Sequence, residues 1–160
     1  MNYMDNYIPF ILIPLVSWGV WHHLKRKNDL TSLKKTTLLI ALLAYSLTEF
    51  GRSFYRPYIY TNHIHDYYIA DTIGNSFGTM TAIFMIITLS GKGTNKDWYL
   101  FLIIIPGLLV YEFLNLTGKT AVDVNDMIAT VIFGLISAIL YFIILKKRGG
   151  DKQPIDRFSE

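Results

Sequence analysis

Two short stretches of this sequence place an acid, a second polar residue and a cation at the same spacing. The first reads EFGRSFYR from Glu49 to Arg56, and the second reads EFLNLTGK from Glu112 to Lys119. Positions i, i+3 and i+7 share one face of a helix. The spacing therefore predicts two polar stripes, made of Glu49, Arg52 and Arg56 in the first stretch and of Glu112, Asn115 and Lys119 in the second.

The segment that follows each stretch carries another acid at helical spacing. Asp71 precedes Asn75 by one turn, and Asp126 precedes Thr130 by one turn. A carboxylate in an apolar setting is costly unless it is paired or protonated, and its raised pKa would suit general acid or base chemistry. We therefore predict that four candidate catalytic acids converge in one cavity: Glu49, Asp71, Glu112 and Asp126.

The other polar residues of these segments suit an anionic ligand. Guanidinium and ammonium groups bind phosphate through charge-assisted hydrogen bonds, and the tyrosines between Tyr55 and Tyr67 could stack on a sugar. The predicted ligand-binding residues are Arg52, Arg56, Asn75, Asn115, Lys119, Asp123 and Thr130.

Structural roles compete with these functional ones. Asp123 could cap the N-terminus of the following helix, where negative charge is favourable. The remaining charges could form a structural network of buried ion pairs. The glycines at positions 74, 78 and 134 are predicted to let neighbouring helices approach closely.

Long uncharged segments must position these residues. The chain has 160 residues, of which 52% are hydrophobic, and its charges are bunched rather than spread. This pattern predicts an all-α polytopic membrane protein. The net charge of +3 is therefore not evidence for binding to nucleic acid, and no nucleic-acid partner is predicted. The first segment lacks a basic leader and is predicted to be a retained helix. The five predicted transmembrane helices cover about residues 7–24, 34–54, 66–90, 97–115 and 124–146.

The distribution of basic residues predicts the orientation. Lysines and arginines gather in the first and third connections and in the C-terminal tail. By the positive-inside rule, the N-terminus is predicted to lie outside the plasma membrane and the C-terminus in the cytoplasm. Residues 1–148 are predicted to form a single transmembrane domain, and residues 149–160 a cytoplasmic tail. After the first helix, residues 34–90 and 97–146 are predicted to be two hairpins that repeat one design in parallel. The alternative is that the two eight-residue stretches resemble each other by chance.

The second hairpin carries a longer pattern: an acid that ends a helix, an amide, a glycine with a basic residue, and two aspartates that open the next helix. These residues are Glu112, Asn115, Gly118, Lys119, Asp123 and Asp126, followed by Thr130 and Gly134. The pattern resembles the VanZ-like family of small bacterial membrane proteins, some of them associated with reduced sensitivity to teicoplanin-type glycopeptides. Departures from the family are Asn115 for glutamine, Lys119 for arginine and Thr130 for asparagine.

The longer connection of the first hairpin contains His63, His65 and Asp66. A His-x-His pair in an extended segment directs both rings the same way, and a carboxylate could complete a divalent metal site. Histidines in an aromatic interfacial loop also occur without metal. We predict no metal or other cofactor, and these three side chains are the candidates should a metal bind.

Three functions fit these features, in decreasing order of preference. The first is a binding or resistance protein whose outward pocket recognises a lipid-linked cell-wall precursor, another anionic amphiphile or a glycopeptide. The second is an intramembrane enzyme that acts on a lipid-linked sugar or phosphate through paired carboxylates. The third is a small ion-coupled transporter, which would need a homo-oligomer because five helices are few. Membrane lipids are expected partners in each case.

Overall fold

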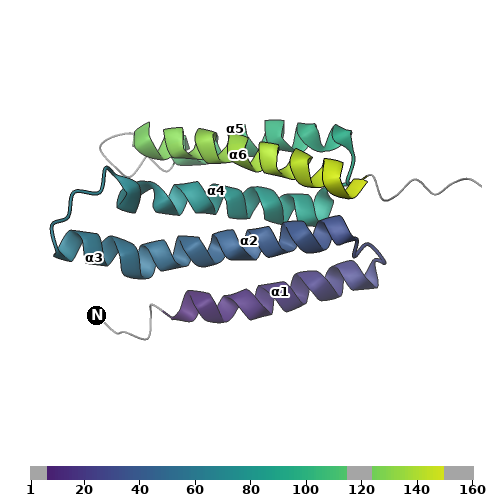
Figure 1. Cartoon of the computed structure of the whole chain (residues 1–160), viewed down its shortest axis with the longest axis horizontal. Helices are drawn as coiled ribbons and strands as arrows, with labels where there is room; N and C mark the ends of the chain where they lie inside the picture. Colours follow the sequence, from purple (N-terminus) through teal and green to yellow (C-terminus); the bar gives the residue numbers. More distant parts are fainter. Residues whose placement is uncertain (1–6, 115–123, 150–160) are drawn as a thin grey trace, which may run out of the picture.

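The computed structural model describes residues 7–114 and 124–149, which form helices and no strand (Figure 1). The all-α prediction is therefore confirmed for the described residues. Its elements are α1 (Ile8–Arg26), α2 (Ser32–Phe50), the π-helix η2 (Gly51–Tyr55), α3 (Arg56–Thr61), α4 (Ile69–Ser90), the 3-10 helix η3 (Asn95–Asp97), α5 (Trp98–Leu114) and α6 (Val124–Gly149).

The helices form five long rods, because α2, η2 and α3 are continuous and make up one of them. Consecutive rods run antiparallel (Figure 1). The second rod reaches Thr61, seven residues beyond the predicted end at 54. Helix α4 lies at the centre, packed against α2 on one side and α6 on the other, while α1 borders α2 and α5 borders α6.

The two ends of the bundle differ in chemistry. The acidic end holds the C-terminal ends of α2 and α5 and the N-terminal ends of α4 and α6, and so carries Glu49, Asp71, Glu112 and Asp126. The basic end holds the connections between α1 and α2 and between α4 and α5, together with the C-terminal end of α6. The four predicted acids therefore lie at one end of the molecule.

Three of the described helical segments are long and apolar enough to cross a membrane. They are Ile69–Ser90, Asn95–Leu114 and Val124–Arg148. The prediction of membrane-crossing helices is confirmed for these three by length and composition. Helices α1 and α2 are not among them; α2 includes two lysines and Glu49, and α1 ends in the sequence WHHLKR.

The hydrophobic core occupies the half of the bundle nearer the basic end. Its buried residues come from α2, α4, α5 and α6: Ala41, Ala44, Met80, Ile83, Phe84, Ile87, Leu100, Phe101, Ile104, Tyr141 and Leu145. In the acidic half, the buried side chains are mostly small or hydroxyl-bearing: Thr48, Ala70, Ser76, Ala129 and Thr130. The acidic half therefore depends on close backbone packing and polar contacts more than on large apolar side chains.

Glycines allow two close approaches between helices. A Cβ added at Gly51 would lie 2.6 Å from Cδ1 of Ile73 on α4, and one added at Gly134 would lie 2.9 Å from Cδ1 of Ile105 on α5. Gly78 differs, because a Cβ there would meet nothing within 4 Å. The prediction that Gly78 serves a close helix contact is therefore wrong.

A buried aspartate organises the basic end. The carboxylate of Asp97, 1% exposed, accepts backbone hydrogen bonds from Lys92 at 3.1 Å, Gly93 at 2.8 Å and Thr94 at 3.1 Å. It also accepts a hydrogen bond from the Tyr141 hydroxyl of α6. Asp97 thereby joins the connection between α4 and α5 to α6.

Candidate functional site

The best-defined polar cluster lies where the rod of α2, η2 and α3 meets the N-terminus of α4. Arg56 donates from Nε to the Ala70 carbonyl at 3.0 Å and from Nη2 to the Asp71 carbonyl at 2.8 Å. Its Nη2 also lies 3.6 Å from Oδ1 of Asp71, and the Tyr60 hydroxyl donates to that same oxygen. Asp71 therefore ties α3 to α4 through two neighbouring side chains.

Arg52 lies one turn before Arg56 on the second rod and contacts α4 one turn further along, at Gly74. A Cβ added at Gly74 would lie 2.8 Å from Nε of Arg52, so the guanidinium rests directly on the α4 backbone. Arg56 contacts α4 at Ala70, one turn before Gly74; the π-helix between the two arginines is closed by the Arg56 N–H bonding to the Gly51 carbonyl. The predicted shared face is thus confirmed for Arg52 and Arg56.

Arg52 differs from Arg56 in its partners. Arg52 is exposed and makes no ion pair with any residue that the structure describes, whereas Arg56 is satisfied by Asp71 and two carbonyls. A guanidinium carries five N–H donors in a planar fork that matches phosphate geometry. At the acidic end, Arg52 is therefore a cation available to an anionic ligand.

The hydrogen bond from Tyr60 to Asp71 raises the pKa of the Tyr60 hydroxyl, with smaller contributions in the same direction from partial burial and nearby negative charge. The bond favours the neutral phenol, because deprotonation would place two negative charges side by side. Tyr60 thus reports on the contact between α3 and α4.

A groove of about 260 Å³ opens between α4 and α6 at the acidic end. Hydroxyls from Thr72 and Ser76 lie along one wall, and Ile128, Ile132 and Phe133 form much of the other. The combination of hydroxyls and branched apolar side chains suits a ligand that is part polar and part hydrocarbon.

Two tyrosines at the mouth of this groove have strained backbones. Tyr67 and Tyr68 line the groove and have φ of 55° and 66°, in the left-handed region that bulky residues avoid. Such conformations cost on the order of 1–3 kcal/mol each and cluster at functional sites. Both rings are exposed, Tyr67 by 79%, so they form an aromatic lip.

The other predicted site residues occupy varied positions. Glu49, Asn75, Glu112 and Asp126 are half-buried, and Thr130 is buried. Among the described residues, neither Glu49 nor Glu112 has a hydrogen-bond or ion-pair partner, although Glu49 and Arg52 both act electrostatically on Tyr45. The convergence of all four acids in one cavity stays a prediction. Three predicted residues lie outside the described residues: Asn115, Lys119 and Asp123.

The histidine connection has structural contacts. Asp66 accepts a hydrogen bond at 2.6 Å from the backbone N–H of Ala70, in the first turn of α4, and the His65 ring packs edge-on against Tyr67 at 4.8 Å between centroids. The described part of the chain contains no group of three histidine, aspartate or glutamate side chains that could hold a metal ion. Asp66 instead serves the start of α4.

Sequence reasoning missed several residues that shape this end. The helical spacing of the charged residues does not single out Gly51, Tyr68 or the hydroxyl pair Thr72 and Ser76. The hydroxyl pair had a detectable signal, since polar residues at i and i+4 on an apolar helix predict a polar stripe. Comparison with known protein families, with characterised proteins and with solved structures finds no match for this chain.

Proposed function

We propose that this chain is a VanZ-like membrane protein whose acidic end binds an anionic amphiphile with the chemistry of a lipid-linked cell-wall precursor. The observation that carries the proposal is Arg52, a guanidinium laid across Gly74 and without an ion pair among the described residues. The groove with its lip of Tyr67 and Tyr68 lies on the α6 side of α4, whereas Arg52 contacts α4 from η2. The groove is therefore a neighbouring apolar surface that would suit hydrocarbon, and it is separate from the phosphate contact. A role in glycopeptide resistance follows from the resemblance.

The proposal includes five membrane crossings. Helices α1 and α2 have 19 residues each, close to the ~20 that the hydrocarbon layer needs, and they lie alongside the three apolar helices. Helix α1 exposes large apolar side chains along its length, including Ile11 at 62% and Leu15 at 59%. Side chains of this kind suit contact with lipid. The positive-inside rule then assigns the basic end to the cytoplasm and the acidic end to the outer face.

Binding of a polyprenyl phosphate to the protein in nanodiscs tests the proposed function. We expect Arg52→Gln to weaken binding by about 10- to 100-fold, because a charge-assisted hydrogen bond contributes roughly 1.5–3 kcal/mol. Binding of the uncharged polyprenol should be unaffected. Arg26→Gln is the matched control, since it removes an exposed arginine at the basic end.

Two outcomes would overturn this assignment. Wild-type affinity in Arg52→Gln would show that the phosphate does not use this guanidinium. An equal loss in Arg26→Gln would show that binding follows the total charge of the protein and not a site at the acidic end.

A further inference from the structure

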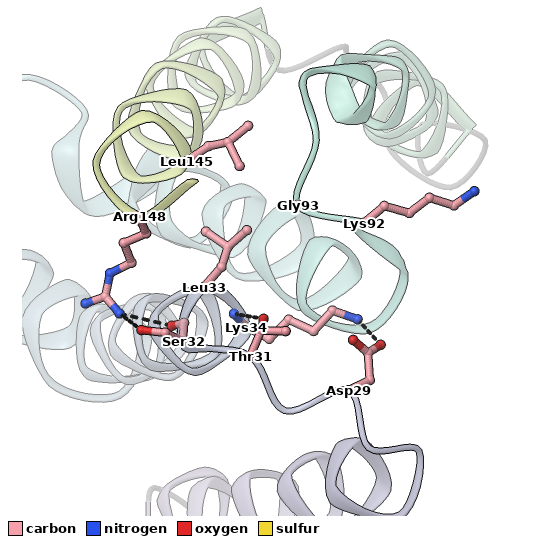
Figure 2. Close-up of a pocket in the computed structure, with 9 residues that line it drawn as sticks. All are labelled: Asp29, Thr31, Ser32, Leu33, Lys34, Lys92, Gly93, Leu145 and Arg148. Carbon is pink, nitrogen blue, oxygen red and sulfur yellow. Dashed lines mark hydrogen bonds and ion pairs between the residues drawn. The ribbon is translucent and has the colours of Figure 1, made fainter. Parts of the chain in front are cut away.

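A second cavity, of about 190 Å³, lies at the basic end (Figure 2). Its walls come from three parts of the chain: the start of α2, the connection between α4 and α5, and the C-terminal end of α6. Figure 2 shows Ser32 and Leu33 facing Leu145 and Arg148 across it. None of these four residues belongs to the proposed site at the acidic end.

The charges around this cavity do not cancel. The ammonium of Lys34, whose side chain is 8% exposed, bonds to the carboxylate of Asp29 and neutralises it. Lys92 and Arg148 also line the cavity, and neither makes an ion pair within the described residues. Two positive charges are therefore left over beside an already satisfied ion pair in which Lys34 is buried and Asp29 is exposed by 44%.

Contacts to α2 hold the guanidinium of Arg148 in place. Its Nη1 donates to the backbone carbonyl of Ser32 at 3.1 Å and also to the Ser32 hydroxyl. The remaining N–H donors of Arg148 have no partner among the described residues. The backbone of Lys92 is anchored on Asp97, while its long side chain extends outward at the rim (Figure 2). Figure 2 shows the Lys92 ammonium directed away from Arg148, so an anion held by both cations requires the flexible Lys92 side chain to turn back over the cavity toward the guanidinium.

We propose that this cavity binds a phosphate group, carried by an anionic membrane lipid or free in solution. Leu33 and Leu145 add apolar walls beside the cations, which favours a phosphate joined to hydrocarbon. Basic pockets between transmembrane helices at the cytoplasmic surface have the chemistry to hold lipid phosphates. A phosphate here would join α2 to α6 and to the connection between α4 and α5, and so would stabilise the basic end.

Thermal unfolding of the full chain in nanodiscs tests this proposal. The protein is compared in phosphatidylcholine alone, in an equal mixture with phosphatidylglycerol, and in phosphatidylcholine with added inorganic phosphate. Arg148→Gln and Lys92→Gln remove the two cations. Lys147→Gln and Lys96→Gln are matched controls, because each removes a lysine from the same region that does not line the cavity.

We expect phosphatidylglycerol to raise the unfolding temperature of the wild type and both controls, and Arg148→Gln and Lys92→Gln to lose most of that rise. An equal rise with inorganic phosphate would identify free phosphate as sufficient, while a rise with the lipid alone would identify the lipid; either supports the site. Equal losses in all four variants, or no rise in the wild type with either probe, would overturn it.

Discussion

At the scale of single residues, the acidic end contains two arginines, Arg52 and Arg56, whose contacts differ. Arg56 is satisfied by Asp71 and two backbone carbonyls, which fits the structural ion-pair interpretation of these charges. Arg52 lies against the α4 backbone at Gly74 and makes no ion pair with a described residue, which fits a ligand contact. The same sequence stripe thus supplies one residue with a structural role and one to which the proposed function assigns ligand binding, and composition alone does not distinguish them.

The bond between Tyr60 and Asp71 predicts a pH dependence. Because the pKa of Tyr60 is raised above its ordinary value of ~10, the contact stabilises the fold below that pH and loses its effect as pH rises through the folded pKa. The difference in near-ultraviolet absorbance between wild type and Tyr60→Phe during alkaline titration isolates this phenol. We expect Asp71→Asn to shift its midpoint to lower pH.

The variant Asp66→Asn serves as the control for this titration, because Asp66 acts on Tyr60 only as the least of its charged neighbours. It should move the midpoint less than Asp71→Asn does. An unchanged midpoint in Asp71→Asn would contradict the assigned hydrogen bond.

At the scale of elements, the π-helix η2 determines how the second rod meets α4. It carries Arg52, which rests on Gly74 of α4, and it places Gly51 against Ile73 of the same helix. The aromatic ring of Phe54 in η2 also packs near Tyr7, 5.9 Å between centroids, so the same segment contacts the start of α1. The π-helix is therefore the point where three parts of the acidic half meet.

This packing predicts opposite effects for two glycine substitutions. Gly51→Ala should destabilise the protein by about 1–3 kcal/mol, because the new Cβ would force Ile73 to move. Gly78→Ala should be neutral or stabilising by up to about 1 kcal/mol, because the site is open and alanine favours the helix. Thermal unfolding in detergent measures both, and the reverse order would contradict the described contact between η2 and α4.

At the scale of the whole molecule, hydrophobic segment length predicted the five rods well. The first, third, fourth and fifth rods begin and end within three residues of their predicted limits, because long apolar runs and short connections leave few alternatives. The second rod extends seven residues beyond its predicted end, since Arg56, Pro57 and the tyrosines that follow resemble a connection in sequence. They continue the helix because Arg56 and Tyr60 find partners on α4.

The site was less predictable than the fold. Helical spacing correctly grouped Arg52 with Arg56, but it could not show that Asp71 belongs to Arg56 and Tyr60. Nor could it find the groove, because a groove depends on how α4 and α6 pack, and that is a contact between segments distant in sequence. The cavity at the basic end joins three such segments and has no linear motif.

Measuring the orientation of this protein in a membrane is the most direct test of the proposed function, because that function requires the acidic end to face outward. The chain has no cysteine, so single substitutions give clean labelling sites. With a membrane-impermeant maleimide, Ile64→Cys in the acidic-end connection should be labelled in intact cells, and Lys96→Cys at the basic end only after permeabilisation. Labelling of Lys96→Cys in intact cells, with Ile64→Cys protected, would contradict the outward-facing acidic end and the function proposed for it.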